Sequence, residues 1–149
     1  MVKAGSLILA AILCALVTAM QASAAPAATV SCPAPYAAMV KALTAMEAEV
    51  QTGVSYGRYE DLLVKVRTAY NRLPTNSVSL ACLNAVGIPA EQAMNNFIRA
   101  SNSWAGCNRR VAAGLSRSCV GSTSYGEASR RIYWQRASAS IQKAVNNIG

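Results

Sequence analysis

Apolar residues recur at three- and four-residue steps along most of the chain, which is the spacing of an α-helix with one buried face. The clearest case is the stretch from Gly87 to Cys107. Pro89 suits a first helical turn, and Gly106 favours a helix end just before the cysteine. The apolar face of this stretch includes the chain's only phenylalanine, Phe97, and one of its two tryptophans, Trp104. The residues that recur along this face are Ala90, Met94, Phe97, Ser101 and Trp104. We predict a core-facing helix here.

The same spacing predicts a first helix over about Pro35 to Gln51 and a second helix that Ser55 caps. Pro74 stops the second helix, because proline cannot continue a helical hydrogen-bond ladder. A short third helix is predicted over Thr75 to Val86. The glycine and proline that open the core-facing helix separate it from this short one.

After Cys107 the chain is basic and interrupted by glycine as far as Cys119, which predicts a loop with about one turn of helix. A capping box opens the final helix, because Ser124 is followed three residues later by Glu127. Arg130 projects onto the apolar side of that final helix. We expect the core to stop short of its first turns, so that the Arg130 side chain extends past the core into solvent.

No run of roughly four to eight residues alternates strictly between apolar and polar with β-branched enrichment, so no strand is predicted. The segments between the apolar stripes are short. The pattern therefore predicts an all-α fold: a small helical bundle of four main helices plus one short helix.

The N-terminus has the features of a secretory signal peptide. Lys3 precedes an apolar run of 14 residues from Leu7 to Met20, and small residues follow up to Ala24. A membrane anchor is disfavoured, because spanning a bilayer takes about 20 apolar residues and this run is shorter. A lipid anchor on Cys14 is also disfavoured, because it would need a small residue before the cysteine and Leu13 stands there. We predict a signal peptide over 1–24, a flexible mature N-terminus over 25–34 and one domain over 35–149. The protein would be exported, to a periplasmic or extracellular location.

Four cysteines remain after the signal peptide, and an even number in an exported chain argues for two disulfides. Sequence alone permits three pairings. We favour Cys32–Cys82, which ties the leading helix to the middle of the chain, and Cys107–Cys119, which closes a short irregular segment. A four-cysteine zinc site is the alternative. It is disfavoured because no two of these cysteines have the C-x₂-C spacing.

Positive charge is concentrated in the last third of the chain. Of 14 Lys and Arg residues, Lys3 leaves with the signal peptide, so 13 bases oppose 6 acids. Residues 25–98 hold five of each, whereas residues 99–149 hold eight bases and one acid, Glu127. This asymmetry indicates an anionic partner, although a basic surface can also serve only solubility. The candidate anion-binding residues are Arg109, Arg110, Arg117, Arg130, Arg131 and Arg136.

The chain contains no histidine, which excludes catalysis and metal binding that depend on imidazole. A catalytic serine–lysine pair does not need histidine and so is still possible. However, the helical pattern predicts that all three lysines of the mature chain face solvent: Lys41, Lys65 and Lys143. The adjacent acids are likewise predicted to lie on solvated faces: Glu47 with Glu49, and Glu60 with Asp61. We predict no catalytic residue, no metal site and no cofactor.

Three functional hypotheses follow. The first is a non-enzymatic binding module whose basic third contacts an anionic envelope polymer, lipid head groups, extracellular nucleic acid or an acidic protein. The second is a membrane- or envelope-active domain that places an apolar face of the last helix at a bilayer interface: Tyr133, Trp134, Ile141 and Val145. The third is a hydrolase without histidine, which would need a carboxylate and a lysine to converge in a cleft.

Overall fold

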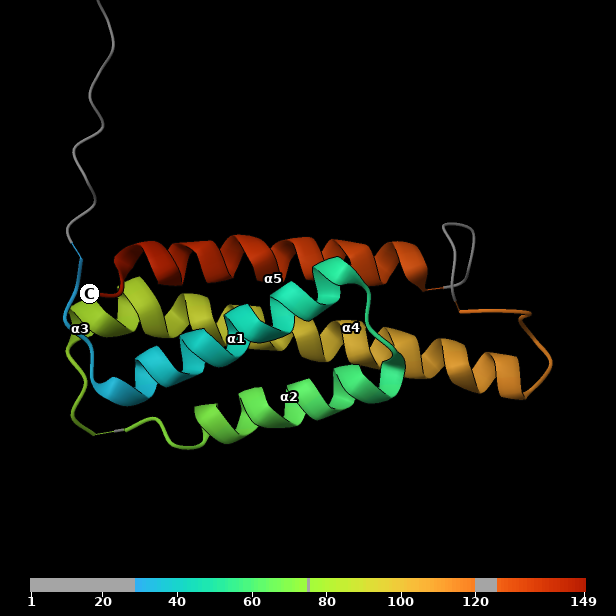
Figure 1. Ribbon diagram of the computed structural model, residues 1–149, viewed down its shortest axis with the longest axis horizontal. Coiled ribbons are helices and arrows are strands. Elements are labelled where there is room, and N and C mark those ends of the chain that lie inside the picture. Colours follow the sequence, from blue (N-terminus) through green and yellow to red (C-terminus); the bar gives the residue numbers. More distant parts are fainter. Residues whose placement is uncertain (1–28, 75, 120–125) are drawn as a thin grey trace, which may run out of the picture.

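Four long helices and one short helix make up the chain over residues 29–74, 76–119 and 126–149, the ranges that the computed structural model describes (Figure 1). The predicted signal peptide, 1–24, lies outside them. The elements are α1 (Ala34–Thr52), α2 (Tyr56–Tyr70), α3 (Leu80–Cys82), a π-helical turn η1 (Leu83–Gly87), α4 (Ile88–Ala112) and α5 (Glu127–Asn147). The predicted all-α bundle is confirmed.

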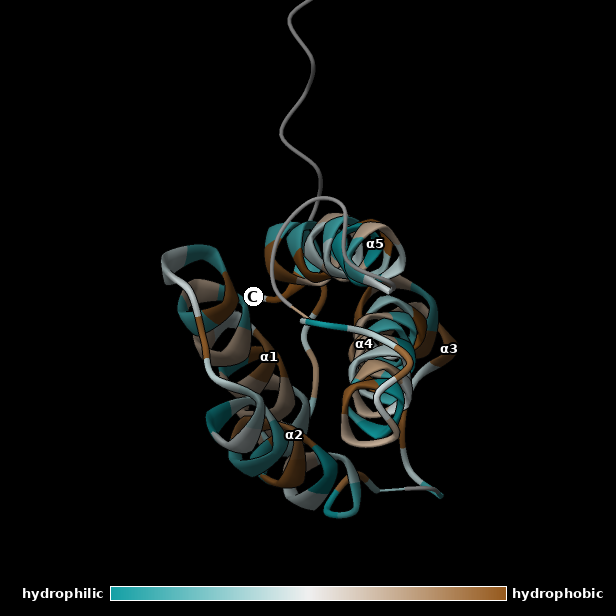
Figure 2. Cartoon of the chain, turned by 90° about the vertical axis from the view of Figure 1, so that its right-hand side faces the viewer, coloured by the Kyte–Doolittle hydropathy of each residue, from teal (hydrophilic) through white to brown (hydrophobic). Residues whose placement is uncertain are grey.

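The helices form two pairs that face each other across the core. Figure 2 looks along the bundle and shows α1 beside α2 on one side, with α4 beside α5 on the other. Short connections explain the first pair: Gly53 ends α1 with a positive φ of 97°, and the Ser55 hydroxyl accepts a hydrogen bond from the Arg58 amide to cap α2. The predicted Ser55 cap is therefore confirmed.

The predicted break between the short helix and the core-facing helix is wrong. Gly87 is helical, with a φ of −61°, and α3, η1 and α4 follow one another without a gap. Pro89 cannot donate to the carbonyl four residues before it. The chain accommodates this with a π turn, in which the Ile88 amide donates to the Leu83 carbonyl five residues back. Gly87 also allows a close approach, since a Cβ there would lie 3.2 Å from the ring of Tyr36.

The predicted end of the core-facing helix at Gly106 is also wrong. The turn of helix expected after Cys107 is present, but it is a continuation of the same helix and the loop begins only after it. Helix α4 continues to Ala112. It ends in a Schellman motif at Gly114, whose φ is +71°: the Gly114 amide donates to the Val111 carbonyl, and the Leu115 amide donates to the Arg110 carbonyl. Gly106 adopts ordinary helical backbone, so glycine alone did not identify the end of the helix.

The start of α5 differs from the predicted capping box. Ser124 lies outside the described residues, and α5 begins at Glu127 after Gly126, which has a φ of 87° and gives no side-chain cap. The Ser103 hydroxyl of α4 instead donates to the Gly126 carbonyl at 3.2 Å. The first turn of α5 is therefore held against α4.

Both favoured disulfides are present, Cys32–Cys82 and Cys107–Cys119. The predicted flexible segment 25–34 is tied down within its described part. Val30 forms a parallel bridge with Ile148, and the Val30 amide donates to the Asn147 carbonyl at 2.7 Å. This contact joins the two ends of the domain, and residues 25–28 lie outside the described ranges.

Aromatic rings fill one part of the core where α2, α4 and α5 meet. Tyr59 is fully buried at its centre, with ring centroids 5.8 to 6.3 Å from Phe97, Trp104 and Trp134. Its hydroxyl donates to the Phe97 carbonyl at 2.9 Å and accepts from the Trp134 indole at 3.2 Å. The predicted core role of Phe97 and Trp104 is confirmed.

Candidate anion-binding site

The six candidate arginines do not form one site. Arg109 and Arg110 lie in the last turn of α4, and Arg117 follows shortly after the helix. Arg131 and Arg136 lie farther along the fold, on α5. These five are exposed, whereas Arg130 is only 1 % exposed.

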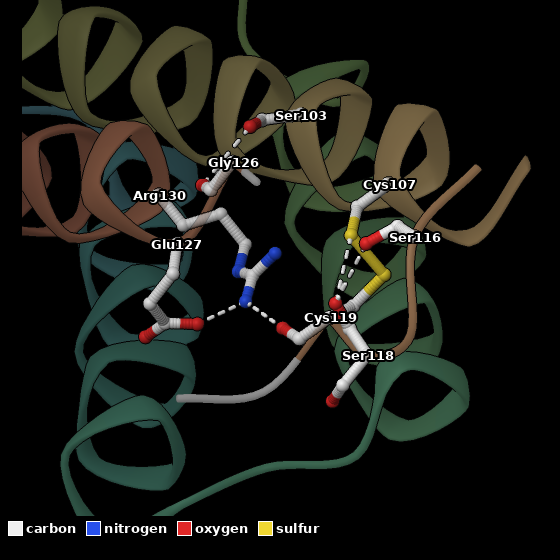
Figure 3. A network of polar contacts seen from close by, with 8 residues as sticks. All are labelled: Ser103, Cys107, Ser116, Ser118, Cys119, Gly126, Glu127 and Arg130. Carbon is white, nitrogen blue, oxygen red and sulfur yellow. Dashed lines mark hydrogen bonds and ion pairs between the residues drawn. A yellow bond between two sulfur atoms is a disulfide. The ribbon is translucent and has the colours of Figure 1, made fainter. Parts of the chain in front are cut away.

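Arg130 is part of the interior, so its predicted extension into solvent is wrong. Its Nη2 atom donates to the Cys119 carbonyl and pairs with the Glu127 carboxylate (Figure 3). Its guanidinium carbon lies 4.7 Å from the centre of a Trp104 ring, a cation–π arrangement. Arg130 therefore supports the junction of α4, α5 and the second disulfide and does not present charge to a ligand.

The reason for this error is the extra length of α4. The helix continues past the start of α5, and the Cys107–Cys119 disulfide brings the Cys119 carbonyl back over the first turn of α5. The core consequently extends over the N-terminal end of α5. The sequence pattern had predicted that the core would stop short of these first turns. The Glu127–Arg130 pair uses the only acid in the last third of the chain.

Three exposed arginines lie close together in the sequence, in the last turn of α4 and shortly after it: Arg109, Arg110 and Arg117. We call the segment 109–117 the arginine tip. In Figure 1 the last turns of α4 extend past the start of α5 and past the connection between α1 and α2. Arg109 and Arg110 also interact favourably with the partial negative charge at the C-terminus of α4. They therefore stabilise the helix and also give the tip its positive charge.

Two apolar side chains are exposed at the arginine tip. Val111 is 36 % exposed and Leu115 is 66 % exposed. In a Schellman motif the residue after the left-handed glycine commonly packs against the preceding turn, but here that residue is the largely exposed Leu115. The sequence pattern did not identify either residue as part of a candidate site. The sequence signal that could have found them is Gly114. A helix that ends at this second glycine has Val111 in its last turn and Leu115 directly after its end.

Two carboxylates that were predicted to face solvent connect helices instead. Glu47 of α1 is buried and accepts hydrogen bonds from Ser138 of α5 and from Gln51. Glu60 of α2 accepts from Ser101 of α4. Helical periodicity could not identify these contacts, because each depends on a partner hydroxyl from a distant helix.

Glu49 remains at the surface. Arg58 donates to its carboxylate at 2.6 Å, and this hydrogen bond lowers the pKa of Glu49. The same contact raises the pKa of Arg58.

Three of the surface hollows on the described residues bear on the hydrolase hypothesis. The one between α1 and α5, of about 260 Å³, contains Glu47, Arg131 and Ser138 but no lysine. A second, at the far end of the same pair of helices, contains Lys41 but no acid, and a third beside the end of α2 contains Glu91 but no lysine. In none of these three do a carboxylate and a lysine converge.

The apolar face of α5 that we considered for a bilayer interface is partly core. Ile141 is fully buried, and the Trp134 indole belongs to the aromatic cluster around Tyr59. Over the described ranges, no helix combines the length and apolar character needed to cross a membrane. A group of three potential metal-ligating side chains is also absent from that part of the chain.

Comparison with known protein families, with curated proteins and with solved structures found no match for this chain.

Proposed function

We propose that the protein is an exported, non-enzymatic binding module that contacts anionic partners through the arginine tip. One observation carries this proposal: the charge excess of the last third is almost entirely at the surface. Its eight bases comprise buried Arg130, which pairs with Glu127, and seven exposed residues: Arg99, Arg109, Arg110, Arg117, Arg131, Arg136 and Lys143.

The local sequence of the tip supports an anionic partner. No acid occurs between Cys107 and Cys119, so this segment carries a net charge of +3 from Arg109, Arg110 and Arg117. Guanidinium groups form paired hydrogen bonds with phosphate and carboxylate. The disulfide and the Schellman motif hold the segment in one shape, which lowers the entropic cost of binding.

The test uses the oxidised mature chain and a mixed-sequence single-stranded oligonucleotide as a soluble polyanion. Affinity should fall steeply with salt, because each neutralised phosphate releases counterions. Changing Arg109, Arg110 and Arg117 to Gln should reduce the log–log salt slope by about 2 if all three contact phosphates.

The matched control changes Lys41, Arg72 and Lys143 to Gln. These residues are exposed: Lys41 lies in the first half of α1, Arg72 just after α2, and Lys143 near the end of α5. Figure 1 shows the start of α1 and the ends of α2 and α5 at the opposite end of the bundle from the end of α4. Both variants lose the same net charge, so a general electrostatic effect would weaken them equally. Equal weakening of the two variants would contradict the proposal, and so would a failure of the unchanged chain to bind either this oligonucleotide or anionic vesicles.

A further inference from the structure

We propose that the arginine tip docks on an anionic lipid surface, with Leu115 and Val111 entering the interface and the arginines contacting head-group phosphates. This inference rests on the proposed function and names the partner of the same site. It uses the C-terminal end of α4, which is distinct from the α5 face that the core occupies.

The tip places apolar and cationic side chains together. Leu115 is 66 % exposed, and its neighbours Arg110 and Arg117 are exposed as well. The backbone there is ordered by hydrogen bonds, since the Leu115 amide donates to the Arg110 carbonyl at 2.8 Å. Leu115 is therefore held on an ordered backbone next to Arg110 and two residues before Arg117.

Charge complementarity selects an anionic surface. The tip carries three arginines and no acid, and each base near an anionic membrane contributes about fivefold to binding. A soluble polyanion would satisfy the guanidinium groups and leave Leu115 in water. A bilayer interface satisfies both, because it offers phosphates beside an apolar layer.

The position of the tip permits such a contact. The last turns of α4 extend beyond the other helices, so they can reach a flat surface before the body of the bundle (Figure 1). The apolar area is small, which predicts reversible peripheral binding and no insertion across the bilayer.

The experiment measures sedimentation of the oxidised mature chain with vesicles of phosphatidylcholine, with or without phosphatidylglycerol. Binding should require phosphatidylglycerol. Leu115→Ser should weaken vesicle binding roughly tenfold, since it removes most of the inserted apolar area. The same change should leave oligonucleotide binding unaltered, because it leaves the arginines in place.

Leu80→Ser is the matched control. Leu80 is 71 % exposed and lies at the N-terminal end of α3, far along the sequence from the tip. It should leave vesicle binding unchanged. A second variant, Leu115→Trp, should show a blue shift of its added emission with phosphatidylglycerol vesicles and none with phosphatidylcholine alone.

The outcomes separate the two proposals. Oligonucleotide binding without vesicle binding, or vesicle binding that Leu115→Ser and Leu80→Ser affect equally, would overturn the lipid inference and leave the proposed function standing. If the unchanged chain bound neither the oligonucleotide nor the vesicles, the proposed function and the lipid inference would both be overturned.

Discussion

Tyr59 shows how one buried polar group organises its surroundings. Its hydroxyl is buried away from water but makes two hydrogen bonds, to the Phe97 carbonyl and from the Trp134 indole. Ionisation would place a negative charge inside the core, so burial raises the pKa of this phenol well above its ordinary value. The residue therefore connects three helices only while it is protonated.

This shift makes the stability contribution of Tyr59 dependent on pH. Up to about pH 10 the phenol is protonated in both the folded and the unfolded chain. Above that pH the unfolded chain releases the proton and folded Tyr59 keeps it, so the free energy of unfolding falls by up to about 1.4 kcal/mol per pH unit.

Tyr59→Phe isolates that contribution. At neutral pH the variant should be less stable by about 1–3 kcal/mol, because the Trp134 indole loses its buried acceptor. The difference should narrow as the pH rises from about 10 to about 11, as measured by urea unfolding. A constant difference across that range would show that Tyr59 titrates alike in both states.

At the scale of the element, Gly106 within α4 and Gly114 just after it show what ends a helix. Gly106 is helical, and a Cβ there would meet only the Arg109 side chain, at an ordinary 3.8 Å. Gly114 has a φ of +71° and closes the Schellman motif. The difference between them is conformational, because only the second adopts the left-handed backbone that other residues avoid.

Alanine substitutions should consequently have opposite effects at these two positions. Gly106→Ala should stabilise the protein by about 0.5–1 kcal/mol, since alanine is the better helix former. Gly114→Ala should destabilise it by about 1–2 kcal/mol, because alanine is strained in left-handed backbone. Thermal or urea unfolding of both variants provides the comparison. The same sign of effect at both positions would contradict our assignment of the end of α4.

At the scale of the whole molecule, two disulfides join segments that lie apart in the sequence. The Cys32–Cys82 disulfide spans 50 residues and anchors the start of α1 to α3. The Cys107–Cys119 disulfide spans 12 residues and holds the carbonyl that Arg130 binds. One cross-link therefore constrains the topology and the other a local junction.

Removing each disulfide should destabilise the protein to a different extent. In the loop-entropy view the double change of Cys32 and Cys82 to Ser costs about 4 kcal/mol, and that of Cys107 and Cys119 about 3 kcal/mol. Equilibrium unfolding in urea measures both. A larger cost for the short disulfide would show that the buried Arg130 contacts, rather than loop length, dominate its contribution.

The local pattern of residues was sufficient to predict the class of fold, the core role of Phe97 and Trp104, the Ser55 cap and the presence of two disulfides, whereas it only favoured the pairing that the structure shows. Each of these depends on spacing, on a short-range hydrogen bond or on cysteine count. The tertiary structure decided the full extent of the long helix, because a π turn accommodates Pro89 and only the backbone conformation distinguishes Gly106 from Gly114.

The tertiary structure also decided which arginines lie at the surface. Helical spacing placed Arg130 on the apolar side but could not show that Cys119, Glu127 and Trp104 enclose it. The exposure of Leu115 depends in the same way on how the chain turns after α4. Periodicity describes one helix at a time, whereas burial depends on what neighbouring segments place over each side chain.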